Sequence, residues 1–147
     1  MIRAELATVV NKPLHDVFDY VVDFSNLPTY DRWVETAEKT SEGPIGVGST
    51  WMHTRVQGRR RIEAPIELVE YEPDRRFAMV SGSKGFDVRS TMTLEAQGDA
   101  PTAMVEVLEM HLSGFVRLFE PMIRRQVLKQ GAEVHQRLKE VLEAKRP

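Results

Sequence analysis

The sequence predicts an α+β fold in which a curved antiparallel sheet of seven strands wraps round one long C-terminal helix. Before Gly114 apolar residues mostly alternate with polar ones, a pattern that gives a strand one buried face. After Gly114 apolar residues recur every three or four positions, which gives a helix one buried stripe. A sheet packed against such a helix can enclose a pocket.

Two short helices are expected directly after the first strand. Residues 2–10 alternate as a strand, and residues 14–23 carry a helical apolar stripe. Pro13 precedes that stripe and suits the first turn of a helix. Pro28 and the aromatic residues after it indicate a second, compact helical corner that packs against the sheet.

Turn signals divide the middle of the chain into six further strands. These are residues 35–41, 49–57, 59–71, 76–81, 86–96 and 102–113. Pro65 lies inside one of them and cannot donate to a ladder, so that strand lies at an edge there or bulges. In the final helix Pro121 either produces a kink or marks the true first turn, and Gly131 costs about 1 kcal/mol relative to alanine.

Composition indicates an ordinary globular protein with one domain, residues 1–147. Hydrophobic residues make up 41% of the chain and charged residues 29%, which is enough apolar content for a core. A formal net charge of −2 lacks the basic excess that draws proteins to phosphate backbones. No nucleic-acid partner is therefore expected, and whether the chain forms a homodimer stays open.

The absence of cysteine excludes disulfides, thiolate nucleophiles and thiolate-bound metal centres. No apolar run approaches the roughly 20 residues of a membrane-spanning helix, and residues 1–10 lack the apolar centre of a signal peptide. Because the sheet needs the apolar face of the final helix, no stable membrane insertion is expected. Cytoplasmic residence is the default expectation.

The order of elements and four short motifs carry a family resemblance. A Gly-Val-Gly segment opens the third strand at residues 46–51, Glu-Tyr-Glu-Pro closes the fourth at residues 70–73, a glycine-containing hairpin lies near residues 81–82, and Leu-Lys occurs at residues 138–139. The chain resembles the SRPBCC superfamily, with its START-like, birch-pollen-allergen-like helix-grip fold. Closest in character are small bacterial proteins of the polyketide cyclase/dehydrase or lipid-transport-like type.

This resemblance implies an apolar cavity between the sheet and the final helix, which the superfamily uses for lipids, hormones, polyketides and other hydrophobic ligands. Its motifs shape turns and supply no reacting group, so the function must be argued from the site. The side chains expected to line the cavity are Phe77, Met79, Met92, Met104, Glu106, Leu108, Phe119, Met122, Ile123 and Gln126.

Glu106 is the first candidate for acid or base chemistry. Alternation from Met104 to Leu112 places this carboxylate on an otherwise apolar face, where burial would raise its pKa. Val105 and Val107 on the opposite face are also apolar, so the pattern leaves the inward face undecided. A position of Glu106 near an edge is the preferred alternative.

His53 is the second candidate, because it shares a face with Arg55 and the two could hold a ligand carboxylate or polarise a carbonyl. We favour the opposite arrangement, in which residues such as Met52 and Thr54 line the pocket and both basic side chains point to solvent. His15, His111 and His135 lie on separate expected elements.

No metal site is expected, because no two of these histidines have ligand spacing. No phosphate-binding loop, dinucleotide fingerprint or nucleophile elbow occurs, so no cofactor is expected either. The leading functional hypothesis is binding, or transport, of a small hydrophobic molecule such as a lipid or polyketide. The alternative is a cyclase or dehydratase in which Glu106 or His53 moves a proton.

Overall fold

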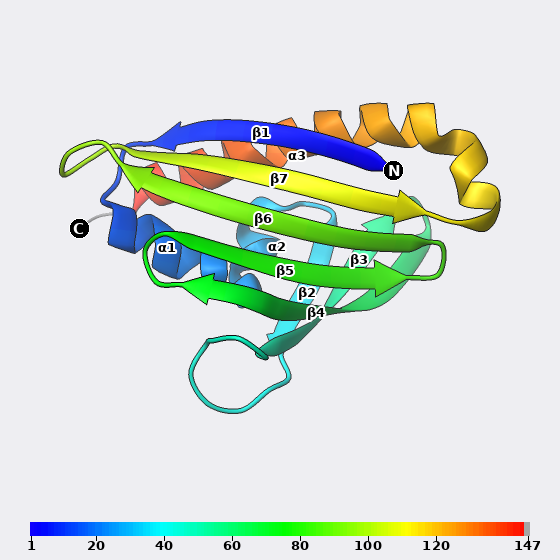
Figure 1. Cartoon of the computed structure of the whole chain (residues 1–147), viewed down its shortest axis with the longest axis horizontal. Coiled ribbons are helices and arrows are strands. Elements are labelled where there is room, and N and C mark those ends of the chain that lie inside the picture. The colour runs from blue at the N-terminus through cyan, green and yellow to red at the C-terminus, as the bar shows by residue number, and fades with distance from the viewer. Residues whose placement is uncertain (146–147) are drawn as a thin grey trace.

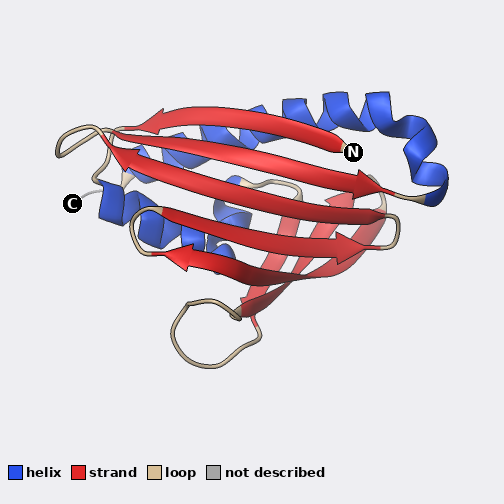
Figure 2. Ribbon diagram, viewed as in Figure 1, coloured by secondary structure: helices blue, strands red, loops and turns tan. Residues whose placement is uncertain are grey.

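The computed structural model describes residues 1–145 and contains a seven-stranded sheet, coloured red in Figure 2. The strands are β1 (Ile2–Val10), β2 (Val34–Lys39), β3 (Thr50–Gln57), β4 (Arg60–Glu72), β5 (Arg76–Ser83), β6 (Phe86–Ala96) and β7 (Thr102–Leu112). They are hydrogen-bonded in the order β1-β7-β6-β5-β4-β3-β2, and all neighbouring pairs are antiparallel. The predicted number of strands is therefore confirmed.

The helices lie on one side of this sheet (Figure 1). Following β1 are α1 (Leu14–Val22), the short 3₁₀ helix η1 (Phe24–Asn26) and α2 (Leu27–Tyr30), and following β7 are the 3₁₀ helix η2 (Gly114–Phe119) and α3 (Glu120–Ala144). Figure 1 shows α3 running back along β1. We call the side of the sheet that faces the helices its inner face. The predicted α+β architecture, with two short helices after the first strand and one long final helix, is confirmed.

None of the helices within residues 1–145 combines the length and the apolar character that a membrane span requires.

The two prolines that the sequence analysis identified as irregular have clear structural places. Pairing of β4 with β5 begins at Ile66, so the preceding Pro65 lies where β4 pairs with β3 alone. The predicted edge position of Pro65 is thus confirmed. Pro121 lies in the first turn of α3, where its missing N–H costs nothing, so it marks a helix start.

The inner face is most tightly packed toward α1. Trp51, Phe77 and Leu138 are almost completely buried there. Aromatic rings meet edge to face, with centroids 4.9 Å apart for Phe24 and Trp51 and 5.7 Å apart for Phe18 and Phe77. Such pairs add to the stability that burial itself provides. This end of the sheet therefore forms a solid core.

Gly131 allows α3 to approach the edge strand β1. A Cβ atom built on Gly131 would lie 2.5 Å from Cδ1 of Leu6, closer than two carbon atoms can pack. The weak position that the sequence indicated inside the helix is thus the point at which the helix backbone lies against the sheet.

Substitution of Gly131 tests this contact. We expect Gly131→Ala to change the free energy of unfolding little, because the helix propensity gain of about 1 kcal/mol is offset by displacement of Leu6. In a Leu6→Ala background, where the clash is absent, the same substitution should stabilise by about 1 kcal/mol. Urea denaturation of the four proteins in this double-mutant cycle measures the coupling. Equal effects in both backgrounds would contradict the packing argument.

Candidate functional site

Four polar side chains form a continuous hydrogen-bonded chain between α3 and the inner face. The Ser90 hydroxyl donates to Oε2 of Glu106 at 2.6 Å, and Nε2 of His135 lies 2.7 Å from Oε1 of the same carboxylate. Nδ1 of His135 lies 2.7 Å from the hydroxyl oxygen of Thr8. We call Thr8, His135, Glu106 and Ser90 the polar chain. It joins β1, α3, β7 and β6.

The strand register explains why these groups meet. Glu106 lies opposite Leu6 on β1 and Met92 on β6, and Ser90 lies one pleat further along β6 on the same face. On α3, His135 shares a buried stripe with Leu138 and Leu142, which lie three and seven positions further on. The buried stripe of α3 therefore places the His135 imidazole against the Glu106 carboxylate on β7.

Glu106 is an ionised group in a largely apolar setting. Burial by itself would raise the pKa of Glu106, but the hydrogen bond and charge of His135 and the hydrogen bond from Ser90 outweigh it, so the pKa lies below its usual range. The Glu106 side chain keeps 18% of its surface accessible, against 6% for His135. The carboxylate is thus charged and held from two sides, and part of its side chain stays accessible.

Tyr30 adds a phenol close to this pair. It is buried in the core, and burial, followed by the charges of Glu106 and Asp31, raises the pKa of its hydroxyl. Tyr30 therefore stays neutral at physiological pH. The helix that carries Tyr30, α2, packs against α3.

The inner-face position of Glu106 is confirmed, and the preferred alternative of a position near an edge is wrong. Glu106 lies in the middle of β7, which has neighbours on both sides. Sequence reasoning missed His135 and Ser90 as its partners. One signal was available for His135, because it is a polar residue on the apolar stripe that contains Leu138.

The favoured outward orientation of His53 and Arg55 is also wrong. His53 is 7% exposed, whereas Met52, which was expected to line the pocket, is 40% exposed. The reason is that Trp51 takes the core position and fixes the alternation of β3. Arg55 forms an ion pair with the buried Asp31 at 3.2 Å, and the carboxylate compensates the positive charge of the guanidinium.

His53 is held as a neutral imidazole. Its Nδ1 lies 2.8 Å from the carbonyl oxygen of Ala64, and only a protonated Nδ1 can donate to that acceptor. Burial, assisted by the charge of Arg55, lowers the pKa of His53 despite this hydrogen bond. A role of His53 in proton transfer stays a prediction.

Most strand residues of the predicted ligand set lie on the inner face. Phe77, Met92 and Met104 are buried, and the register places Met79 and Leu108 on either side of Ser90, where both are half-buried. Whether these residues bind a ligand is a prediction that the fold leaves untested.

The helix residues of that set are placed differently. Phe119 is 53% and Met122 64% exposed, Gln126 is also exposed, and Ile123 is half-buried. The expected convergence of Phe119, Met122 and Gln126 on the sheet is therefore wrong. The physical reason is that α3 begins beyond the N-terminal end of β1 (Figure 1), so its first turns have no strand beneath them.

Toward η2, several side chains of the inner face are less buried than those near α1. On the three central strands of this half, five inward side chains are only partly buried, although Ile2 and Ala4 beside them on β1 are buried. The five are Met79, Ser81, Val88, Leu108 and Met110. We call this group the open half of the inner face. Glu106 lies at the boundary between it and the solid core.

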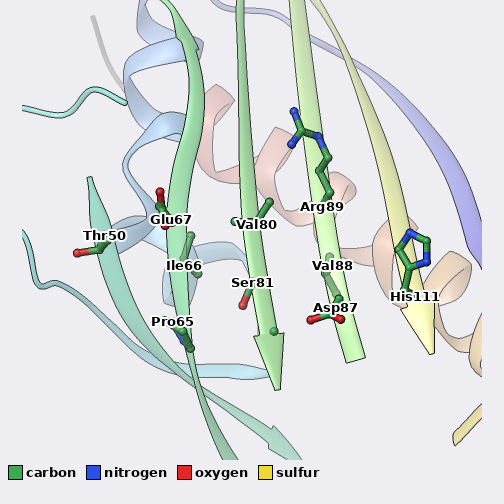
Figure 3. Close-up of a pocket in the computed structure, with 11 residues that line it drawn as sticks. Thr50, Pro65, Ile66, Glu67, Val80, Ser81, Asp87, Val88, Arg89 and His111 are labelled. Atoms are coloured by element: carbon green, nitrogen blue, oxygen red, sulfur yellow. The ribbon is translucent and has the colours of Figure 1, made fainter. Parts of the chain in front are cut away.

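Two hollows occur elsewhere on the molecule. One, of about 470 Å³, lies on the outer face and includes Glu67, Val80 and Arg89, which are neighbours across β4, β5 and β6 (Figure 3). The other, of about 540 Å³, lies between α2 and α3 and includes Tyr30 and Val134. Neither is lined by the predicted ligand residues, so neither is the expected cavity between the sheet and the final helix. The open half of the inner face is the candidate site because Met79 and Leu108 of the predicted set lie there beside Ser90.

His15, Asp19 and Asp74 form a small exposed cluster away from the inner face. Their ligand atoms lie within 4.8 Å of one another. Nδ1 of His15 lies 2.9 Å from Asp74 and Nε2 lies 3.0 Å from Asp19. The hydrogen bond to Asp74 and the charge of Asp19 raise the pKa of His15. In this arrangement both imidazole nitrogens are engaged by the carboxylates.

Comparison with known proteins agrees with this architecture. A protein-family model described as polyketide cyclase / dehydrase and lipid transport matches residues 1–143. The chain belongs to this family. The family match and the fold together place it in the SRPBCC superfamily. A search of curated protein sequences gave no significant match.

Solved structures of low sequence identity share the fold. TTHA0849 from Thermus thermophilus superposes with a TM-score of 0.81 at 18% identity, covering 97% of each chain. The ZhuI aromatase/cyclase from Streptomyces sp. R1128 has a TM-score of 0.79 at 12% identity, covering 96% of this chain and 93% of the other. Ara h 8.0201 has a TM-score of 0.74 at 15% identity, covering 97% of this chain and 98% of the other. At these identities the likeness concerns the fold alone.

Breaking the His135–Glu106 hydrogen bond of the polar chain should destabilise the protein more than replacing both partners. We expect Glu106→Ala or His135→Ala to lower the free energy of unfolding by about 3 kcal/mol, because each leaves a buried group without its partner. The double substitution Glu106→Leu/His135→Leu should recover most of that loss, since apolar side chains replace both buried polar groups. Urea denaturation measures all four proteins, and additive losses in the double variant would argue against the pair.

His53 should make stability fall on mild acidification. Because the folded protein lowers the pKa of His53, the unfolded chain takes up the proton first as the pH falls below about 6.5, the ordinary histidine value. The wild type should therefore lose more stability between pH 7.5 and 5.5 than His53→Asn does. His15→Gln is the matched control of opposite sign, because the raised pKa of His15 favours the folded state on acidification. Denaturant midpoints at both pH values give the comparison, and parallel pH profiles for all three proteins would refute it.

Proposed function

We propose that the protein binds a small hydrophobic molecule against the open half of the inner face, with Glu106 accepting a hydrogen bond from a hydroxyl or enol group of that molecule. The observation that carries the proposal is an ionised, accessible carboxylate at the border of half-buried apolar side chains such as Met79 and Leu108. Membership of the polyketide cyclase / dehydrase and lipid transport family supports a hydrophobic ligand.

Affinity and orientation would come from different parts of this surface. Burying apolar ligand area against the open half contributes roughly 25 cal/mol per Å². Ser90 and His135 hold the Glu106 carboxylate in place before a ligand arrives, so little ordering is needed on binding. The fixed Glu106 carboxylate therefore favours ligands that carry a hydrogen-bond donor, because a ligand without one leaves the carboxylate unpaired.

The alternative function is a cyclase or dehydratase that uses the same surface. The specific observation in its favour is the polar chain, because an imidazole hydrogen-bonded to a carboxylate can pass a proton between them. Aromatase/cyclases are among the proteins that share the fold, at 12% identity for ZhuI. Binding without a cofactor and residence in the cytoplasm stay predictions.

A pair of ligands that differ by one hydroxyl tests the binding proposal. We expect 2-naphthol to bind the wild type at least tenfold more tightly than naphthalene, because a hydrogen bond to a charged acceptor contributes about 1.5–3 kcal/mol. Glu106→Leu should remove this preference and leave naphthalene binding intact. Glu109→Gln, on the opposite face of the same strand, is the matched control and should behave as the wild type. Titration calorimetry measures each affinity.

Native mass spectrometry with organic extraction shows whether the protein carries a natural ligand when it is purified. We expect protein purified from its host to retain a hydrophobic molecule that bears a hydroxyl group.

In the calorimetry experiment, equal affinities for naphthalene and 2-naphthol would contradict the role of Glu106. Turnover of a poly-carbonyl compound that Glu106→Gln abolishes would instead favour the enzyme.

A further inference from the structure

Four large apolar side chains form an exposed stripe where η2 continues into α3. Phe115 is 84%, Leu118 76%, Phe119 53% and Met122 64% exposed. Phe115 and Leu118, three positions apart in the 3₁₀ helix η2, share one side of it, and Phe119 and Met122 follow where α3 begins. We call these residues the apolar stripe. Exposed apolar side chains that gather in one place mark an interaction surface.

The apolar stripe faces away from the sheet. The side of η2 that meets the sheet carries the partly buried Val116, whose Cγ2 would lie 3.0 Å from a Cβ built on Gly85 in the β5–β6 turn. Figure 1 shows the segment, in yellow and orange, projecting past the N-terminal end of β1. The sequence-based expectation that the sheet uses all the apolar surface of the final helix is therefore wrong for its first turns.

Cationic side chains surround the stripe. Arg117, Arg124, Arg125 and Lys129 are all exposed, and none of them forms an ion pair with a carboxylate among residues 1–145. The acidic residue of the segment, Glu120, is paired with the N-terminal amine at 3.0 Å. A chain with a net charge of −2 thus carries a locally positive surface at this end.

We propose that the apolar stripe and its cationic surround are a reversible docking surface for a bilayer of anionic lipids. Aromatic and aliphatic side chains enter the interface, and arginines meet the lipid phosphates. A second copy of the chain fits less well, because a stable dimer buries about 20–30 residues on each side and the stripe offers four. Docking of this kind is peripheral, which agrees with the absence of stable insertion expected from the sequence.

Docking would bring the open half of the inner face next to the bilayer, since that half lies toward η2. A hydrophobic molecule could then exchange between lipid and protein over a short path. The docking proposal itself does not depend on Glu106 or on the identity of the ligand, and its test needs neither.

Co-sedimentation with sucrose-loaded vesicles tests the proposal. We expect the full chain to bind phosphatidylglycerol vesicles in about 50 mM salt and to bind phosphatidylcholine vesicles at least tenfold more weakly. Phe115→Ser/Leu118→Ser should lower the bound fraction at least tenfold, and Arg124→Gln/Arg125→Gln should lower it on the anionic vesicles alone. These side chains are exposed, so circular dichroism should be unchanged.

Val47→Ser is the matched control, because Val47 is 68% exposed on the β2–β3 connection. It should bind vesicles as the wild type does. Failure of the wild type to bind anionic vesicles, or equal binding by Phe115→Ser/Leu118→Ser, would overturn the proposal. So would sedimentation of the wild type as a dimer that the same two substitutions dissociate, because the stripe would then be an interface between copies.

Discussion

The hydrogen bond between His135 and the Glu106 carboxylate fixes where the long helix lies on the sheet. A charge in a low-dielectric interior must keep its partner, so sliding or rotating α3 would leave the carboxylate unpaired. Thr8 and Ser90 extend this restraint to the strands on either side of β7. The contact of Gly131 with Leu6, one helical turn earlier, then sets how near the helix backbone comes. One polar contact and one steric contact together determine the position of α3.

The same hydrogen bond lies between two parts of the inner face that have different physical properties. Toward α1, aromatic and aliphatic side chains fill the space, as Trp51 and Phe77 do. Toward η2, the sheet extends under a helix that has only begun to approach it, and residues such as Val88 and Met110 are partly covered. Stability is concentrated in one half and accessible apolar surface in the other. A single sheet can thus support both a rigid core and a surface for ligands.

Much of the fold could be predicted from the sequence, because periodicity reports directly on which face of an element is buried. The seven strands, the edge position of Pro65 and the role of Pro121 all follow from local rules. The orientation of β3 could not, since Trp51 and Met52 are both apolar and only packing decides between them. Nor could the pairing of Glu106 with His135, which are 29 residues apart, because no local pattern reports on contacts between a strand and a distant helix. The first turns of α3 carry a helical pattern that says nothing about how far the sheet extends beneath them.

Before Ile66, β4 pairs with β3 alone and leaves its other edge open, which has a consequence for self-association. Main-chain groups along an open strand edge invite another strand to add, and such addition leads to aggregation. Here Pro65 offers no N–H at the end of the exposed length, and Arg60 places like charges on any two copies that approach in register, whereas Arg61 is paired with Glu35. The protein can therefore carry a projecting hairpin arm without templating fibrils from it.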